Sequence, residues 1–231
     1  MALFAIGDLH LSLGTDKPMD IFGEKWRNHA EKLREGFSVV GPEDTVVLCG
    51  DLSWGMGLTG TLEDFRFIDS LPGKKIIIKG NHDYWWTTAN KINSFFADNG
   101  LTSLSIMHNS SVTLGDIALC GTRGWFFEEE TGGAHDKKIM LREVGRLKTS
   151  LESAGDAREK LVFLHYPPIY GNYRCEEILD LLKEHEIRHC YYGHIHGKAI
   201  SGAFNGWAGG TEFRLVSADA VDFRPVRVAC D

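Results

Sequence analysis

Short apolar runs alternate with amphipathic segments along the first half of the chain. Apolar runs such as Ala2–Gly7 are typical of strands that are buried on both faces. Between them, apolar residues recur three or four positions apart, which indicates helices with one buried side. This part of the chain therefore predicts a βαβαβ arrangement with parallel strands and right-handed crossovers. The expected strands are Ala2–Gly7, Thr45–Cys49 and Lys75–Lys79, and the expected helices are Trp26–Phe37, Thr61–Ser70 and Thr87–Asp98.

The pattern changes after Asn99-Gly100, where three short strands with tight connections follow. We expect these strands, Ser103–Met107, Ser111–Leu114 and Asp116–Cys120, to pair antiparallel. One domain over residues 1–231 is predicted, of the α/β class with α+β character: a four-layer sandwich of two mixed β-sheets flanked by helices. The remaining expected elements are helices Lys137–Ala154 and Glu176–His185 and strands Lys160–Leu164, His189–Tyr192, Lys198–Ser201 and Glu212–Ser217.

Composition narrows the class of protein. The chain has 231 residues, 43% of them apolar, and contains no apolar run of the roughly 18 residues that a transmembrane helix needs. The N-terminus enters the first expected strand without a basic segment, so we expect no secretory signal peptide. Five scattered cysteines without a C-x-x-C pair predict a reducing, cytoplasmic location. The net charge of −7 counts against a broad nucleic-acid-binding surface, although bound cations could still attract a small anionic substrate.

Side chains that can bind metal ions follow five of the expected strands. They lie in the strings GDLH, CGDLSW, KGNHDYWW, FLHYPP and GHIH. Open sheets place their binding sites at the carboxyl ends of strands, so these side chains are expected to meet. The candidate metal ligands are Asp8, His10, Asp51, Asn81, His165, His194 and His196.

Each string taken alone has an ordinary explanation. Asp8-Leu9-His10 is compatible with a capped turn, Asp51 with a simple turn, and His194-Ile195-His196 with surface histidines. The occurrence of all five together favours a metal site. Carboxylate and amide oxygens mixed with imidazoles suit Mn²⁺, iron, Zn²⁺ or Co²⁺ better than Ca²⁺. A structural zinc site usually has four thiolate-rich ligands, whereas this set is larger and has no cysteine, so a two-cation site for phosphate ester hydrolysis is the favoured interpretation.

With these strings in the order D-x-H, G-D, G-N-H-[DE], H and G-H-x-H, the chain resembles the calcineurin-like metallophosphoesterases. The residues in GDLSW, GNHDYWW and HYPP are similar to those of a bacterial branch of predicted phosphohydrolases. The resemblance implies the metallophosphatase fold and a dinuclear centre, with Mn²⁺ the expected metal and Fe, Zn, Co or Mg as alternatives. One metal would be held by Asp8, His10 and His196 and the other by Asn81, His165 and His194, with Asp51 bridging both.

The resemblance also implies a mechanism in which a hydroxide shared by the two metals attacks phosphorus, with Asp51 as part of the catalytic set. His82 would stabilise the phosphoryl oxygens or protonate the leaving group. Asp83 would orient His82, although a turn or cap residue is the alternative. Besides Asn81 and His82, the substrate could be contacted by Arg123, which could instead pair with surface acids at Glu128–Glu130.

Aromatic residues crowd the metal-binding strings and the long irregular stretch Gly121–Ala134. They could form a wall that stacks a nucleobase or an apolar ester group. We favour the alternative, packing between helix and sheet. The residues concerned are Trp54, Tyr84, Trp85, Trp86, Trp125 and Phe126. Five histidines match no string and are interpreted as structural or exposed: His29, His108, His135, His185 and His189.

The leading interpretation is a metal-dependent phosphoesterase that acts on a small phosphomonoester or phosphodiester. A nuclease or cyclic-nucleotide phosphodiesterase is the enzymatic alternative, and the acidic net charge counts against the nuclease. A metal-binding scaffold for protein partners, without turnover, is the alternative of another class. Such a scaffold often lacks a ligand or the Asn-His pair, whereas this set is complete. The natural substrate, native metal and oligomeric state do not follow from the sequence.

Overall fold

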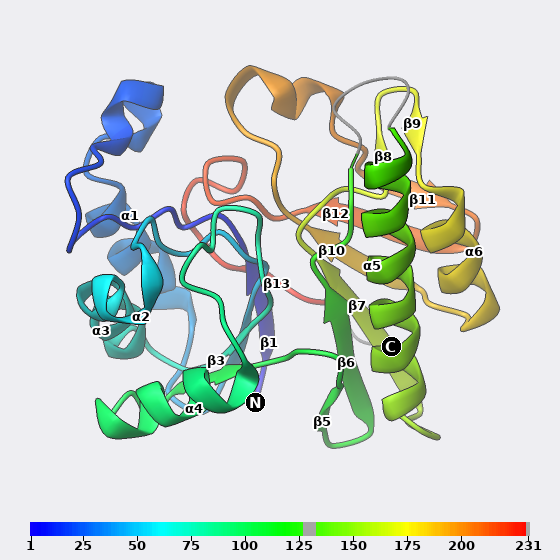
Figure 1. Cartoon of the computed structure of the whole chain (residues 1–231), viewed down its shortest axis with the longest axis horizontal. Coiled ribbons are helices and arrows are strands. Elements are labelled where there is room, and N and C mark those ends of the chain that lie inside the picture. Colours follow the sequence, from blue (N-terminus) through cyan, green and yellow to red (C-terminus); the bar gives the residue numbers. More distant parts are fainter. Residues whose placement is uncertain (127–132, 230–231) are drawn as a thin grey trace.

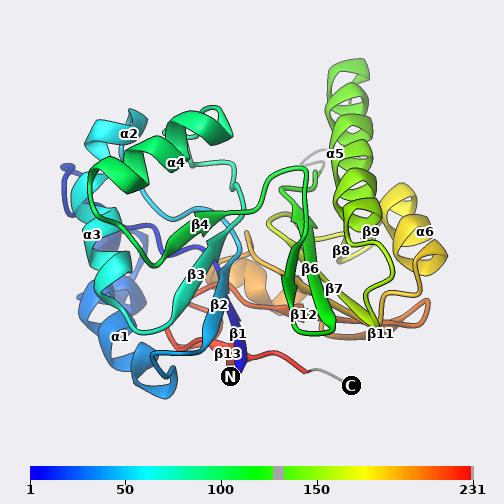
Figure 2. The same cartoon turned by 90° about the horizontal axis from the view of Figure 1, so that it is seen from below.

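Two β-sheets face each other in the computed structural model, which describes residues 1–126 and 133–229 (Figures 1 and 2). The first sheet has the order β13-β1-β2-β3-β4. Strands β1 to β4 are parallel, and β13 is antiparallel at the edge. The strands are β1 (Leu3–Ile6), β2 (Thr45–Leu48), β3 (Lys74–Ile77), β4 (Leu104–Ile106) and β13 (Val226–Arg227).

The second sheet has the order β11-β12-β10-β7-β6-β5. Its four inner strands are parallel, and the edge strands β5 and β11 are antiparallel, so both sheets are mixed. Its strands are β5 (Val112–Leu114), β6 (Ile117–Thr122), β7 (Glu159–Leu164), β10 (His189–Tyr192), β11 (Gly206–Ala208) and β12 (Thr211–Leu215), and a separate hairpin is formed by β8 (Ile169–Tyr170) and β9 (Tyr173–Arg174).

Helices cover the outer face of each sheet, which confirms the predicted four-layer sandwich (Figure 1). No helix in the described ranges is both long and apolar enough to span a membrane. The first sheet is covered by α1 (His29–Gly36), α3 (Leu62–Ser70) and α4 (Ala89–Asp98), and the second by α5 (Ala134–Ser153) and α6 (Glu176–Glu184). Shorter elements are α2 (Gly57–Gly60) and the 3-10 helices η1 (Met19–Phe22), η2 (Glu24–Trp26), η3 (Phe37–Val39) and η4 (Gly197–Gly202).

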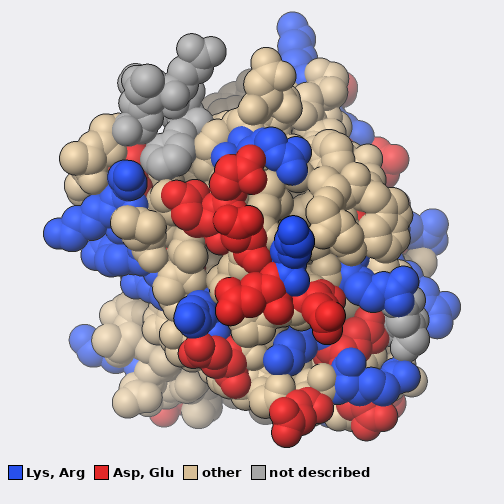
Figure 3. Space-filling view, turned by 90° about the vertical axis from the view of Figure 1, so that its right-hand side faces the viewer, with Lys and Arg blue, Asp and Glu red and all other residues tan. Residues whose placement is uncertain are grey.

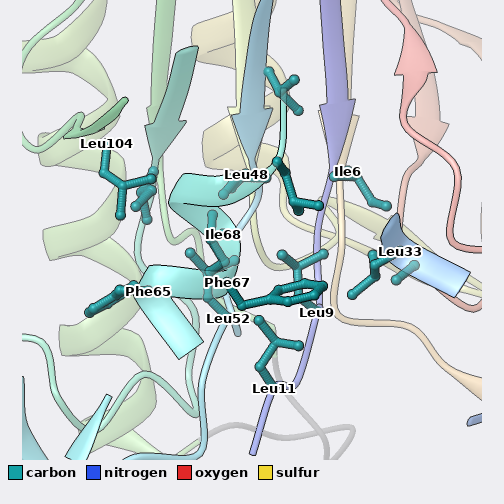
Figure 4. Packing of buried hydrophobic residues seen from close by; sticks show 14 of the residues in the cluster. Ile6, Leu9, Leu11, Leu33, Leu48, Leu52, Phe65, Phe67, Ile68 and Leu104 are labelled. Atoms are coloured by element: carbon teal, nitrogen blue, oxygen red, sulfur yellow. The ribbon is translucent and has the colours of Figure 1, made fainter. Parts of the chain in front are cut away.

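The period-two alternation of buried strands explains the layering. In β1, Phe4 and Ile6 point toward the helices, whereas Leu3 and Ala5 point toward the second sheet. Side chains of α3 fill the space on the helical side, where Ile68 lies among the apolar residues shown in Figure 4. Because both faces of these strands are covered, their sequences are apolar throughout rather than alternating with polar residues.

The outer surface of the second sheet's helices is polar. On α6, the exposed positions include Glu176, Glu177 and Asp180, while the opposite side of the helix packs on the sheet. Acidic side chains gather in the middle of the face shown in Figure 3, with Lys and Arg around them. The described residues of this face therefore form no continuous basic stripe.

Two of the predicted elements are wrong. β4, expected as an antiparallel strand, pairs parallel with β3, because the α4 crossover returns the chain to the same end of the sheet. The segment Lys198–Ser201, expected as a strand, lies in the 3-10 helix η4. That helix begins directly after His196, where the Gly197 N–H donates to a carboxylate oxygen of Asp219 at 2.8 Å. The two- and three-residue strands β8, β9, β11 and β13 were not predicted, since such short strands leave no recognisable period.

Candidate metal centre

The carboxyl ends of five parallel strands converge at one edge of the sandwich. β1, β2 and β3 are adjacent in the first sheet, and β7 and β10 are adjacent in the second. The two sheets are joined at this edge, where the Gly7 N–H donates to the Val216 carbonyl oxygen at 2.8 Å. The seven candidate ligands therefore come from separate parts of the sequence to one place.

Two groups of three side chains could each hold a metal ion. In each group the nearest ligand atoms all lie within 4.8 Å of one another. The other six histidines, His82 among them, belong to neither group in the described part of the chain. The first half-site consists of Asp8, His10 and His196, and the second of Asp51, His165 and His194.

Asp51 lies between the two half-sites. Its Oδ2 is 3.5 Å from His165 Nε2 in the second half-site and 3.9 Å from His10 Nε2 in the first. The seventh candidate, Asn81, places its Oδ1 2.6 Å from His165 Nε2. Asp51 therefore lies within reach of both half-sites, and Asn81 lies beside the second.

Four of the candidate ligands have left-handed backbone conformations, which non-glycine residues rarely adopt. Their φ angles are 60° at Asp8, 45° at His10, 55° at Asp51 and 74° at His194. Each such residue costs of order 1–3 kcal/mol, and strain of this kind is concentrated at functional sites. The left-handed residue turns the chain sharply after the strand and directs the side chain over the strand end.

Two glycines allow the backbone to approach the carboxylates. A Cβ atom at Gly80 would collide with the Asp51 carboxylate, and one at Gly193 would collide with the Asp8 carboxylate. The Asp8 carboxylate also accepts the His194 N–H at 2.9 Å, and that of Asp51 accepts the His82 N–H at 2.7 Å. The Gly-Asn and Gly-His pairs of the sequence thus serve packing around the carboxylates as well as supplying ligands.

The charges of the first half-site are strongly coupled. Burial alone would raise the pKa of Asp8, but His196, His165 and His10 together outweigh it and hold this pKa below its ordinary value. Burial would lower the pKa of His196, yet Asp8 and Asp219 raise it to about 10. In the metal-free protein a proton on His196 therefore provides the positive charge between these carboxylates.

In the second half-site a carboxylate rather than an imidazole holds part of a proton at neutral pH. Burial raises the pKa of Asp51 to about 7, against the opposing effect of His165 and with the help of the neighbouring carboxylates Asp83 and Asp8. Burial also lowers the pKa of His194 to about 3, so its imidazole is neutral, which is the form that binds metals. A buried carboxylate beside the neutral imidazole of His194 fits a cation well.

The orientation of two imidazoles also fits metal binding. His165 Nδ1 is 2.9 Å from the Cys49 carbonyl oxygen, and this contact turns Nε2 toward the Asn81 oxygen, 2.6 Å away. His196 Nδ1 is held by Asp219 Oδ1 at 2.8 Å, which leaves its Nε2 directed at Asp8 Oδ1, 3.2 Å away. Hydrogen bonds of this kind fix the tautomer and raise the basicity of a metal-binding histidine.

Asp219 is a site residue that the sequence reasoning missed. It lies in the turn after β12, the neighbour of β10 in the second sheet. The signal that could have found it is its place, an acidic residue just beyond another apolar strand. It belongs to none of the five strings, so the sequence pattern does not mark it.

His82 lies at the opening of the centre. Its ring centroid is 4.6 Å from that of Trp54 and 5.8 Å from that of His10. His82 Nδ1 is 3.1 Å from the Tyr84 hydroxyl. Burial, followed by the charges of His165 and Lys17, lowers the pKa of His82 to about 4, so the ring is neutral in the metal-free protein.

The structure gives Asp83 a different place from the one proposed above. Its carboxylate accepts the N–H groups of Asp51 at 2.9 Å, Leu52 at 2.9 Å and Gly80 at 2.7 Å, as well as the Trp85 indole N–H. Within the described residues it makes no hydrogen bond to the His82 ring. Asp83 therefore holds the loops after β2 and β3 together, and the hypothesis that it orients His82 is corrected.

The Arg123 side chain does not point toward the metal-binding groups. Its Nη2 is 3.3 Å from Glu143 Oε1, and its guanidinium lies over the Trp125 ring. Its carbonyl oxygen accepts the N–H groups of His165 and Tyr166. The expected alternative partners, Glu128–Glu130, lie outside the described residues. The Arg123 backbone thus supports the loop that carries His165, and its guanidinium pairs with the Glu143 carboxylate.

The aromatic residues divide between two roles. Trp85 is buried in the core, as favoured from the sequence. Trp54 packs against the core and also lines a cavity of about 540 Å³ beside the metal-binding groups. Tyr84 lines the same cavity and is exposed, so the core interpretation is wrong for Tyr84. Trp26, from a predicted helix, also lines this cavity and was not foreseen as a site residue.

Comparisons with known proteins agree with this geometry. The calcineurin-like phosphoesterase family matches residues 1–198. The phosphopantetheinyl hydrolase (PptH) of Mycobacterium tuberculosis superposes with a TM-score of 0.61 at 14% identity, covering 100% of this chain and 96% of that one. TT1561 of Thermus thermophilus gives 0.50 at 13% identity, covering 91% of this chain and 86% of that one.

At these identities the two structures show likeness of fold alone. No protein with a curated function matches the chain in sequence. The family match covers most of the chain. The five sequence strings that carry the candidate ligands meet at one edge of the expected sandwich. The chain therefore belongs to the calcineurin-like phosphoesterase family and is a hydrolase acting on phosphate esters.

Proposed function

We propose that the protein hydrolyses a small phosphomonoester or phosphodiester at a dinuclear metal centre. The observation that carries the proposal is the pair of adjacent half-sites with Asp51 between them. Asp8, His10 and His196 would hold one cation, Asn81, His165 and His194 the other, and Asp51 both. Oxygen and imidazole donors without a thiolate favour Mn²⁺, with Fe, Zn, Co and Mg as alternatives.

When bound, two divalent cations lower the pKa of water and neutralise charge on the phosphoryl oxygens. The side chains around them supply position and orientation. Asp219 and the Cys49 carbonyl fix the rings of His196 and His165, and Asp83 fixes the loop that carries Asn81. A substrate held against such a fixed framework loses less entropy on reaching the transition state.

His82 is the residue proposed to act on the substrate itself. Its ring lies beside His10 and Trp54 and is partly exposed to the cavity. With Nδ1 facing the Tyr84 hydroxyl, Nε2 is the atom left to interact with a phosphoryl oxygen or the leaving-group oxygen. A hydrogen bond donated by the Nε2–H of the neutral ring would stabilise the charge that develops there.

The test is hydrolysis by metal-stripped protein before and after addition of Mn²⁺. p-Nitrophenyl phosphate and bis-p-nitrophenyl phosphate serve as the monoester and the diester, and Asp51→Asn is the control. The proposal predicts turnover that needs both Mn²⁺ and Asp51, and the preferred ester separates monoesterase from diesterase. Absence of turnover of both esters, in protein shown to bind two metals, would contradict the proposed activity on simple esters and favour the scaffold alternative.

A further inference from the structure

The cavity beside the metal centre has a composition of its own. It occupies about 540 Å³, within the range of small-molecule sites. One side is formed by residues of the metal centre, His10, His82 and His196. The rest comes from the segment around η1 and η2 and from the loops after β2 and β3, which supply Lys17, Met19, Phe22, Trp26, Trp54 and Tyr84.

Aromatic rings dominate the walls. Trp54 stacks on the imidazole of His10, with ring centroids 5.0 Å apart and an angle of 21° between the planes. Trp26 lies edge-on to the rings of His10 and His196, at 5.7 Å from each. Phe22 and Tyr84 are exposed at the cavity's edge, although large apolar side chains usually avoid water. A planar apolar group that leaves the metal centre in this direction would be covered by rings on several sides.

Lys17 places one positive charge in this apolar cavity. Its Nζ is 2.9 Å from the centroid of the Trp54 ring. Among the described residues Lys17 forms no ion pair, in contrast to Lys25 of η2, whose Nζ is 2.7 Å from Asp222 Oδ1. Partial burial lowers the pKa of Lys17, as expected for an ammonium with an indole in place of a carboxylate. Such a charge is poorly matched to a plain hydrocarbon chain and well matched to an anion.

We propose that this cavity binds the organic part of the substrate, and that this part contains a planar aromatic ring system and a second negatively charged group, which pairs with Lys17. The inference rests on the proposed function and adds the substrate class to it. An anion entering the cavity gives Lys17 a stronger partner than the indole and frees the face of Trp54 for the ring. The phosphoryl group to be cleaved remains at the metal centre.

Three esters with similar leaving groups test the proposal in Mn²⁺-loaded protein: phenyl phosphate, 2-naphthyl phosphate and 6-sulfo-2-naphthyl phosphate. Their methyl diesters replace them if the protein proves to be a diesterase. Burial of the second ring predicts a kcat/KM about fivefold to tenfold higher for the naphthyl than for the phenyl ester. Equal values for these two esters would overturn the aromatic part of the proposal.

Lys17→Met tests the second charge, because methionine keeps the length of the side chain and removes the ammonium. We expect the kcat/KM ratio of sulfonated to plain naphthyl ester to fall about threefold to fivefold. Lys25→Met is the matched control and should leave this ratio unchanged, since Lys25 pairs with Asp222 outside the cavity. An unchanged ratio in Lys17→Met would overturn the assignment of Lys17.

A binding measurement separates this inference from the proposed function. 2-Naphthylmethylphosphonate and its 6-sulfo derivative contain a C–P bond in place of the ester and cannot be hydrolysed at that position. Calorimetry with the metal-loaded protein should show the same dependence on Lys17 in their ratio of dissociation constants. If no ester is hydrolysed but the Lys17 effect on binding is present, the proposed function fails and the cavity assignment stands. If hydrolysis is found and neither ratio responds to Lys17→Met, the proposed function stands and the cavity assignment fails.

Discussion

The two half-sites of the metal centre use similar ligands but are supported differently. In the first, the His196 side chain is 28% exposed and is oriented by a carboxylate, that of Asp219. In the second, the His165 side chain is fully buried and is oriented by a neutral group, the Cys49 carbonyl oxygen. The first half-site therefore has a second carboxylate behind its histidine and lines the aromatic cavity, whereas the second has a buried histidine held by a neutral group. Each half-site also contains one half-buried histidine, His196 in the first and His194 in the second.

With a metal ion in each half-site, as proposed, this difference would give the two ions different surroundings. A carboxylate behind a histidine raises its basicity, while a carbonyl oxygen mainly fixes its orientation. We expect the first half-site to be sensitive to pH and to changes in Asp219, and the second to be sensitive to packing around β2, β3 and β7.

Asp51→Asn should have the largest effect, because Asp51 is the residue placed between both half-sites. Loss of its charge should lower kcat at least about 10³-fold and reduce bound Mn²⁺ to one equivalent or less. Elemental analysis of the dialysed protein and the ester assay measure the two effects. Two tightly bound metals in the variant would show that Asp51 does not bridge them.

Asp219→Asn should weaken the first half-site selectively. Removal of the carboxylate behind His196 is expected to lower Mn²⁺ affinity there about 10- to 100-fold, with the second half-site unaffected. Titration calorimetry resolves the two binding steps. Asp222→Asn is the control, because Asp222 is highly exposed and pairs with Lys25 instead. Equal weakening of both steps would remove the contrast between the half-sites.

Gly193→Ala should destabilise the fold at the first half-site. The added Cβ meets the Asp8 carboxylate, and relief of that overlap is expected to cost about 1–3 kcal/mol in the free energy of unfolding. Urea denaturation of metal-free protein measures it. Gly145→Ala in α5 is the control, because its Cβ meets nothing within 4 Å and alanine favours a helix. Wild-type stability in Gly193→Ala would mean that the loop has room the structure does not show.

Proton release should distinguish the half-sites at neutral pH. The pKa of His196 is raised to about 10, so this ring is protonated below that pH in metal-free protein and must lose its proton to bind a metal. Affinity at the first half-site should thus rise about tenfold per pH unit between pH 6 and 8. In the second half-site His194, with its pKa lowered to about 3, releases no proton, and Asp51, with its pKa raised to about 7, releases only part of one at neutral pH. Calorimetry in buffers of different ionisation enthalpy counts the protons released when a metal binds. Binding at the first half-site without proton release would contradict the assignment of a proton to His196.

The sequence predicted the sandwich and the set of candidate ligands because both depend on local patterns. Apolar runs mark the buried strands, and the ligands follow directly after strands that lie side by side. Asp219 and the cavity residue Trp26 could not be identified in this way. Trp26 lies beside His196 in the structure, although the two residues are far apart in the sequence. Asp83 stands next to His82 in the chain, yet its carboxylate turns to the backbone of the β2 loop, a direction that adjacency does not give.

The most direct test of the account is the position of the metals in a crystal of Mn²⁺-loaded protein. Anomalous diffraction at a wavelength where manganese scatters strongly locates each ion independently of the protein coordinates. The account predicts two peaks, one among Asp8, His10 and His196 and one among Asn81, His165 and His194, with Asp51 contacting both. A single peak, or two peaks without Asp51 between them, would contradict the dinuclear centre.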